Sequence, residues 1–211
     1  HLSIVGLNGA GKTTFIKLLC RLYDTTDGEI LLDNVDIREY DYNEYISLFS
    51  PVFQDFKLFG FSLRENIVLD HDCTEQNFLA LLAQIGLKQN ADTILFKFFD
   101  EHGLEPSGGE QQKIAIARAL FKRAPVVILD EPTAALDPFA EYDIYRHFNT
   151  LIGNKTAVYI SHRLSSCKFC DRIAVFSEGC VKEYGTHEEL VKKTGGIYAE
   201  LFNAQAQYYN N

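Results

Sequence analysis

Residues 6–13 read GLNGAGKT, a stretch that fits the pattern G-x-x-x-x-G-K-[ST] at every position. Its three glycines let the backbone curl so that its N–H groups point inward around a phosphate. Lys12 adds a full positive charge for β- and γ-phosphates, and the Thr13 hydroxyl is a hard oxygen ligand that suits Mg²⁺. The alternative is a glycine-rich loop that only caps a helix, and the complete pattern with its flanking elements disfavours it.

The sequence on both sides of this loop predicts a strand before it and a helix after it. Residues 2–5 are short, apolar and partly β-branched, which is typical of a buried strand. Residues 15–22 predict a helix, and a helix N-terminus behind the loop would add roughly half a positive charge. Further along, residues 29–36 predict a strand, a turn and a strand, and residues 50–53 predict another short strand.

The pattern becomes helical from about residue 70 to residue 123. One apolar face recurs at helical spacing and is formed by Phe78, Leu81, Leu82 and Ile85. A long helix is predicted from Ser107 to about Lys122. This stretch therefore predicts a helical subdomain inserted into the rest of the fold.

Three later apolar runs predict core strands, at residues 126–129, 157–160 and 173–176. Because strands alternate with helices, the predicted fold class is α/β with a mainly parallel central sheet and flanking helices. We expect residues 1–69 to form the first part of this core, residues 70–123 the helical subdomain, and residues 124–211 the second part of the core with the C-terminal helices.

The composition is that of a globular and acidic chain. Of its 211 residues, 46% are hydrophobic and 23% are charged, which excludes intrinsic disorder. The formal net charge of −9 gives no general attraction to nucleic acid or anionic lipid. No apolar run approaches the ~20 residues of a membrane span. The sequence holds no Met and opens with His1, so we expect it to be a piece of a longer polypeptide.

The cysteines are predicted to be reduced thiols in a cytosolic setting, because their number is odd and no secretory signal leads the chain. Cys167 and Cys170 form a C-x-x-C, but a closed zinc site needs four ligands. We therefore expect packing rather than metal or redox chemistry. The five cysteines are Cys20, Cys73, Cys167, Cys170 and Cys180.

Polar side chains follow several of the predicted strands. Asp130 and Glu131 come directly after the run at 126–129, at a strand end where open α/β sheets place their ligands. We expect Asp130 to hold Mg²⁺ and Glu131 to orient or deprotonate an attacking water. Gln54 would ligate Mg²⁺ and sense the γ-phosphate, and His162 would hydrogen-bond that phosphate. Each residue alone is also explained as an ordinary loop or structural residue, and the phosphate loop favours the functional interpretation.

The predicted long helix begins with SGGEQQ at residues 107–112. Ser107 with Glu110 three residues later is a capping box. The same geometry, a hydroxyl beside the amides of Gly108 and Gly109 at a helix N-terminus, also makes an anion site. Both interpretations can hold together. Since the chain already has one phosphate loop, a second site suggests a phosphate clamped from outside.

These motifs together resemble the ABC ATPase family, in the order of that family and over nearly the whole chain. They are the phosphate loop 6–13, the glutamine loop at Gln54, the signature 107–111, the acidic pair 130–131, a D-loop-like stretch 135–137 and a switch-like stretch 161–163. The resemblance implies a P-loop NTPase fold of ABC type, with a partial antiparallel β subdomain and an inserted helical subdomain. It also implies ATP and Mg²⁺ as ligands, and ATP hydrolysis.

The resemblance further implies a head-to-tail dimer of two such domains, identical or different, with two ATPs sandwiched between them. Asp137 would connect the two sites. The residues implied to bind nucleotide are Asn8, Gly9, Ala10, Gly11, Lys12, Thr13, Thr14, Ser107, Gly108, Gly109, Glu110 and Asp137. Those implied in catalysis are Lys12, Gln54, Glu131 and His162, and those implied in holding Mg²⁺ are Thr13, Gln54 and Asp130.

Finer features are similar to the exporter branch of this family. FKLF at 56–59 and SLRENI at 62–67 resemble the segment that meets the transmembrane domain, and GTHEEL at 185–190 resembles the exporter C-terminal end. The resemblance implies a transmembrane domain on the same polypeptide, a position at the cytoplasmic face of the membrane, and no nucleic-acid partner. The transported substrate is not written in these residues.

The chain departs from the family pattern at two positions and by one absence. Pro106 stands where Leu is usual, and Glu110 stands where Gln is commonest and adds negative charge beside a phosphate site. The base-stacking aromatic of the family lies upstream of residue 1.

The rival function is a soluble ABC ATPase acting on ribosomes or DNA. The short segment between residues 6 and 107, which lacks heptads, disfavours the DNA-acting type. A non-hydrolysing scaffold is disfavoured by Asp130, Glu131 and His162.

Overall fold

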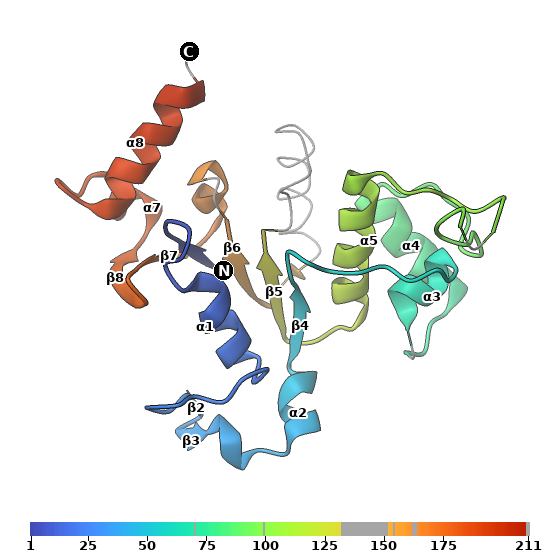
Figure 1. The fold of residues 1–211 in the computed structure, drawn as a ribbon, viewed down its shortest axis with the longest axis horizontal. Helices are drawn as coiled ribbons and strands as arrows, with labels where there is room; N and C mark the ends of the chain where they lie inside the picture. Colours follow the sequence, from blue (N-terminus) through green and yellow to red (C-terminus); the bar gives the residue numbers. More distant parts are fainter. Residues whose placement is uncertain (70, 99, 132–151, 154, 162–163, 210–211) are drawn as a thin grey trace. The chain divides into compact units, whose positions relative to one another are not determined.

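The computed structural model describes residues 1–69, 71–98, 100–131, 152–153, 155–161 and 164–209 (Figure 1). Contacts divide the chain into two units. The first comprises residues 1–49, 128–131 and 156–211, and the second comprises residues 50–127 and 132–155. The chain passes between them along strands β4 (Phe49–Val52) and β5 (Val126–Asp130). Among the described helices, none is long and apolar enough to cross a membrane. The predicted three-part division of the chain stays a prediction.

The first unit is built on a mainly parallel sheet, which confirms the predicted α/β class. Strand β1 (Leu2–Val5) pairs in parallel with β6 (Thr156–Ile160) on one side and with β7 (Arg172–Ser177) on the other. Within this unit the strand order is β5-β6-β1-β7-β8. The carboxyl ends of β1 and β6 therefore lie at the same edge of the sheet, and the phosphate loop follows β1. The Glu131 N–H, directly after β5, donates to the carbonyl of Ile160 at the end of β6, which places Asp130 at this edge as well.

The parallel strands form continuous apolar runs because both of their faces are buried. Ile4, Val5, Ile128, Ile160 and Ile173 are each fully buried. Burying one such side chain contributes about 1.5–3 kcal/mol. The central strands that carry the loop and Asp130 are thus held firmly by the core.

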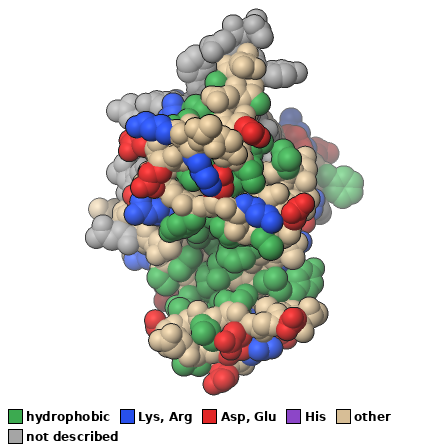
Figure 2. All heavy atoms as spheres, turned by 90° about the vertical axis from the view of Figure 1, so that its left-hand side faces the viewer, with side chains coloured by type: hydrophobic (Ala, Val, Ile, Leu, Met, Phe, Trp, Pro, Cys, Tyr) green, Lys and Arg blue, Asp and Glu red, His purple; other side chains and the backbone are tan. Residues whose placement is uncertain are grey.

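Strand β8 (Cys180–Gly185) was not predicted from the sequence. It runs antiparallel to β7, and the hairpin turns at Glu178 and Gly179, which both have positive φ. Two such residues are the mark of a type I′ turn. Val181 and Tyr184 are exposed on this edge strand, and Figure 2 shows apolar side chains on that face. Strand β8 therefore lacks the continuous run of buried apolar residues that predicts a core strand.

Helix α1 (Lys12–Leu19) begins three residues before the predicted start at Phe15 and ends earlier than predicted. The predicted bounds are wrong because Gly11, in the left-handed conformation, lets the helix begin directly behind the loop. At its other end Arg21 adopts a φ of 55°, and the Leu22 N–H donates to the Lys17 carbonyl at 2.9 Å. This is a Schellman ending, which usually takes glycine.

The remaining elements of the first unit are short, except the last helix. The predicted strand-turn-strand is confirmed as the antiparallel pair β2 (Leu31–Leu32) and β3 (Val35–Asp36). The others are η1 (Ile37–Glu39), α2 (Tyr42–Ser47), η2 (Leu164–Phe169), α7 (His187–Val191) and α8 (Ile197–Tyr209).

The described part of the second unit is mostly helical. Its helices are α3 (Leu63–Val68), α4 (Glu75–Ile85) and α5 (Gly108–Phe121). The predicted apolar face of α4 is buried at Phe78, Leu81 and Leu82, while Ile85 is half-buried. The predicted helix from Ser107 to Lys122 is confirmed, because these two residues are the N-cap and the C-cap of α5.

The charged side chain of Arg118 links helix α5 to α3 and to the segment before α3. The Arg118 guanidinium donates to the carbonyls of Asn66 at 2.7 Å and Lys57 at 3.0 Å, and it lies over the Phe59 ring. Asn66 is fully buried and its amide donates to the Phe59 carbonyl at 2.9 Å. These bonds hold the long helix that carries the signature residues in a fixed register.

Candidate phosphate-binding site

The loop between β1 and α1 has a backbone that only glycine permits at two positions. A Cβ added at Gly6 would lie 2.3 Å from the Phe176 carbonyl oxygen, and Gly11 has a φ of 97°. The loop is also tied to the β7–β8 turn, since the Gly179 N–H donates to the Ala10 carbonyl at 3.2 Å. The shape of the loop is therefore set by contacts with distant strands as well as by its own glycines.

The first turn of α1 is left open to an anion. Its N-cap is Gly11, which gives no side-chain cap, and the first turn holds no acidic residue. Asn8, Gly9, Thr13 and Thr14 are exposed around it. The free amides and partial positive charge of a helix N-terminus are the elements of a phosphate site.

Lys12 is folded into the loop. It is only 5% exposed, and its ammonium donates to the carbonyls of Gly6 at 2.9 Å and Leu7 at 3.0 Å. Burial lowers the pKa of Lys12, while the nearby Glu131 and Asp130 act in the opposite direction. Burial removes most of the water that would stabilise the charge of the Lys12 ammonium. A bound triphosphate would stabilise that charge again, so this buried ammonium is suited to bind one.

Thr13 and Asp130 are brought together from separate elements. The Thr13 hydroxyl donates to the Asp130 carboxylate at 3.0 Å, although the two residues are 117 positions apart. Asp130 ends β5 and is 1% exposed. A hydroxyl beside a carboxylate is a set of hard oxygens that fits Mg²⁺. The described residues contain no group of three His, Cys, Asp or Glu that could hold a metal, so the fit rests on this mixed pair.

Glu131 has an unusual backbone directly after the strand. Its φ is 53°, in the left-handed region, and its N–H donates to the Ile160 carbonyl at 3.0 Å. A non-glycine residue in this region costs about 1–2 kcal/mol, and such strain collects at functional sites. Glu131 is half-buried, whereas Asp130 before it is buried.

The other predicted residues fall into two groups. In the second unit, Gln54 is exposed in the turn directly after β4, and Ser107 is the exposed N-cap of α5. Gly108 is exposed, while Gly109 and Glu110 are half-buried. Two further predicted residues, Asp137 and His162, lie outside the described residues.

The predicted capping box at α5 is confirmed. The Ser107 hydroxyl accepts from the Glu110 N–H at 3.3 Å, and the Glu110 carboxylate accepts from the Ser107 N–H at 2.9 Å and from its hydroxyl at 2.8 Å. Gln89 donates to the same carboxylate at 2.6 Å. The bonds from Ser107 hold the pKa of Glu110 below its usual value, so Glu110 is ionised at neutral pH.

The C-x-x-C lies in the first unit, at the end of η2. Cys167 is fully buried with its sulfur 3.3 Å from the Ser3 hydroxyl, and burial raises its pKa to about 11. Burial likewise raises the pKa of Cys170 to about 12. The thiolate is the form of cysteine that binds metals and acts as a nucleophile. The raised pKa values keep both cysteines in the less reactive thiol form.

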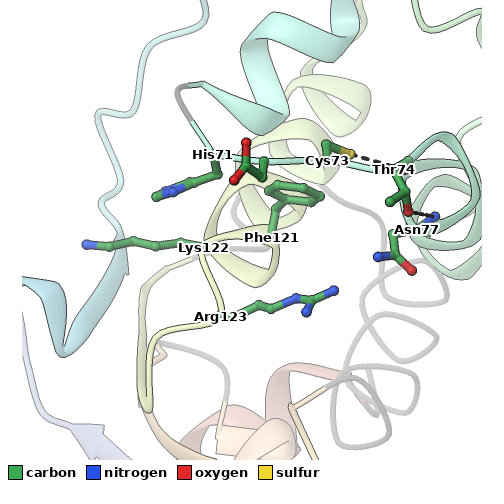
Figure 3. A pocket seen from close by; sticks show the side chains of 8 residues that line it. His71, Cys73, Thr74, Asn77, Phe121, Lys122 and Arg123 are labelled. Carbon is green, nitrogen blue, oxygen red and sulfur yellow. Dashed lines mark hydrogen bonds between the residues drawn. The ribbon is translucent and has the colours of Figure 1, made fainter.

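Two cavities lie within single units. A cavity of about 450 Å³ in the first unit adjoins the phosphate loop and is lined by residues that include Gly6, Asn8, Ser161, Leu164 and Gln205. Gln205 lies in the polar stretch of α8, and no local motif in the sequence marks it. Another cavity, of about 400 Å³ in the second unit, is shown in Figure 3 and is lined by His71, Asp72, Cys73, Thr74, Asn77, Phe121, Lys122 and Arg123. None of the predicted site residues lines this second cavity.

Comparison with known proteins matches the geometry. A family model described as "ABC transporter" matches residues 1–134. The subtilin transport ATP-binding protein SpaT of Bacillus subtilis is 42% identical over 95% of this chain and 34% of its own length. The mitochondrial iron-sulfur clusters transporter ATM1 of Candida glabrata is 40% identical over 96% of this chain and 29% of its own. The ATP-dependent lipid A-core flippase of Burkholderia orbicola is 36% identical over 98% and 35%.

A solved structure of a bacterial Atm1-family ABC exporter with ATP bound superimposes with a TM-score of 0.87 at 35% identity, covering 97% of this chain and 37% of that one. The fold and the glycine loop therefore define a P-loop ATPase domain. The chain belongs to the ABC transporter family, and within it to the ATP-binding domains of exporter-like members. It spans about a third of the length of the curated relatives it matches.

Proposed function

We propose that this chain is the motor domain of an ABC exporter, which binds Mg-ATP, pairs head-to-tail with a second such domain, and hydrolyses the nucleotide to drive a transmembrane domain. The observation that carries the proposal is the hydrogen bond of 3.0 Å between Thr13 and Asp130 beside the buried Lys12. It joins a phosphate cradle to a pair of hard oxygen ligands at one strand end.

Each residue has a role that follows from its position. Lys12 and the amides of α1 would hold the β- and γ-phosphates. Thr13 and Asp130, with Gln54 as a further ligand, would hold Mg²⁺, which neutralises charge on the phosphate oxygens when it is bound. Glu131 would orient the attacking water and accept its proton, with help from His162.

The signature residues would act on the second copy. Ser107 and the amides of Gly108 and Gly109 would close over the γ-phosphate held by the partner domain, and Asp137 would link the two sites. Positioning and electrostatics dominate phosphoryl transfer, so closure of this kind assembles the reactive arrangement.

We place the domain at the cytoplasmic face of a membrane, attached to a transmembrane domain on the same polypeptide. Two observations support this: the chain covers about a third of relatives that include a lipid A-core flippase, and 37% of the superimposed Atm1-family ABC exporter. The transported substrate would be selected by the transmembrane part.

The test is Glu131→Gln in the full-length protein. General-base catalysis contributes about 10²–10⁴-fold, so turnover should fall by about a hundredfold or more while ATP binding persists. Steady-state phosphate release and equilibrium binding of a fluorescent ATP analogue measure the two effects. Near-normal turnover in this variant would remove Glu131 from its role.

Glu178→Gln is the matched control. Glu178 is also a glutamate in the left-handed region, with a φ of 54°, but its side chain is 83% exposed in the β7–β8 turn. This variant should keep both turnover and binding, which separates the role of the Glu131 carboxylate from any effect of altering a strained glutamate.

A further inference from the structure

Helix α8 reaches back to the segment that follows β6. The Gln205 side-chain oxygen accepts a hydrogen bond of 2.9 Å from the Leu164 N–H, across 41 positions of sequence. Leu164 is the first residue of η2 and is 3% exposed. It stands two residues after His162 in the chain, so this bond fixes the backbone immediately downstream of the predicted switch residue.

The other end of α8 is anchored on strand β8. The Glu183 carboxylate is 7% exposed and accepts from the N–H groups of Ile197 at 3.2 Å and Tyr198 at 3.0 Å, and from the Lys193 ammonium at 2.8 Å. A carboxylate at a helix N-terminus satisfies free amides and complements the helix dipole. Residues outside the helix thus fix where α8 begins.

The side of α8 between these two ends is packed. Tyr198 is fully buried in one apolar cluster with Leu164 and Cys167, and Phe202 packs against that cluster. The Lys168 ammonium lies over the Phe202 ring, 5.6 Å from its centre. Helix α8 therefore packs along η2, and Gln205 accepts a hydrogen bond from the N–H of Leu164, the first residue of η2.

Gln205 also faces the phosphate loop. It lines the cavity of about 450 Å³ together with Gly6 and Asn8 of the loop and with Ser161 and Leu164. Ser161 and Leu164 are the described residues on either side of positions 162 and 163. Both ends of that short connection thus border the same cavity as the loop that would hold ATP.

We infer that Gln205 is a positioning residue for ATP hydrolysis, which acts through its bond to the N–H of Leu164, two residues after His162 in the sequence. The inference rests on the proposed function, because it needs His162 to act on the γ-phosphate. It assigns α8 a part in turnover that no motif in the sequence indicates. Gln205 contacts the backbone of Leu164, so its effect on the rate would be indirect.

The experiment compares two variants in the full-length protein. Gln205→Met keeps the length of the side chain and loses the acceptor, whereas Gln205→Glu keeps an acceptor oxygen. The loss of one neutral hydrogen bond corresponds to about a three- to tenfold effect. We expect Gln205→Met to lower kcat by that factor with KM for ATP unchanged, and Gln205→Glu to recover most of it. Wild-type kcat in Gln205→Met, or no recovery in Gln205→Glu, would overturn the inference.

A second readout follows the bond itself. Hydrogen exchange at the Leu164 amide should be faster in Gln205→Met than in the wild type and protected again in Gln205→Glu. Gln207→Met, two positions along the same helix at an exposed residue, is the control and should change neither kcat nor exchange. Unchanged exchange in Gln205→Met would also contradict the inference.

His162→Ala separates this inference from the proposed function. If His162→Ala abolishes turnover while Gln205→Met does not slow it, only the positioning role is wrong. If His162→Ala leaves turnover intact, the assignment of the switch residue is wrong, and the positioning role falls with it. A slow His162→Ala variant that Gln205→Met slows no further is the result we expect.

Discussion

The N-termini of α1 and α5 are both predicted to meet phosphate, yet they are built in opposite ways. Helix α1 begins at Gly11 with no side-chain cap and no acid in its first turn. Helix α5 begins at Ser107 with a complete capping box and an ionised Glu110 in its first turn. The first leaves its amides and dipole for a ligand, whereas the second already uses its own serine and glutamate to satisfy them.

This difference suggests a division of labour within one domain. The α1 end, with the buried Lys12, is equipped to hold a triphosphate alone. The α5 end has its charge balanced within its own first turn, so it would add little to binding unless a second domain brings a phosphate to it. The domain would thus bind ATP alone, and α5 would act once a partner domain is present.

The largest effect is expected at the α1 end. Lys12→Ala should weaken Mg-ATP binding by about 10- to 100-fold, because hydrogen bonds to a charged group contribute about 1.5–3 kcal/mol. Isothermal titration with Mg-ATP measures this in the full-length protein. Lys17→Ala, in the last turn of the same helix, is the control and should bind normally. Unchanged affinity in Lys12→Ala would contradict the assignment of the phosphate loop.

The sequence was informative where local chemistry decides the structure. GLNGAGKT predicts its own loop because Gly6 and Gly11 permit backbone positions that other residues do not, and the capping box of Ser107 and Glu110 closes within a single turn. The apolar runs at β1, β5, β6 and β7 predicted strands because a doubly buried strand shows no alternation.

Features that depend on distant contacts could not be predicted in this way. The loop before α1 is tied to Gly179, far along the chain. Strand β8 is an edge strand with exposed apolar residues, so its pattern looks like loop. Gln205 contacts Leu164 across 41 positions, and nothing in its neighbourhood marks it. Tertiary contacts decided all of these.

A smaller effect is expected from Ser107→Ala, which tests whether α5 does more than cap itself. Loss of a capping serine costs about 0.5–2 kcal/mol of stability. Thr186→Ala removes an equivalent capping box at α7, outside every predicted site, and serves as the control. Thermal unfolding should show similar losses for both variants. Only Ser107→Ala should also lower ATP turnover in the full-length protein, and equal turnover in the two variants would leave α5 with capping alone.

The smallest effect is expected from Glu110→Gln, which makes the first turn of α5 more like that of α1. Glutamine keeps an acceptor for the Ser107 N–H and removes one negative charge beside the predicted γ-phosphate. ATP-dependent dimerisation should therefore strengthen by a few-fold at low salt, and the gain should shrink as salt screens the charge. Sedimentation of the full-length protein in a nucleotide-trapping background measures it. Glu105→Gln, two residues before the cap and exposed, is the control.

Glu110→Gln should also change how the stability of the protein depends on pH. This change distinguishes the capping role of Glu110 from its effect on the phosphate contact. The pKa of Glu110 is lowered on folding by its bonds to Ser107, so its ionised form stabilises the native state above the unfolded pKa of about 4.3. That contribution is lost as the pH falls through the lower folded pKa. Thermal melts of the wild type should therefore lose stability below about pH 4 more steeply than melts of Glu110→Gln. If the two curves run parallel while dimerisation still strengthens, the charge of Glu110 acts on the partner's phosphate and contributes nothing to its own helix.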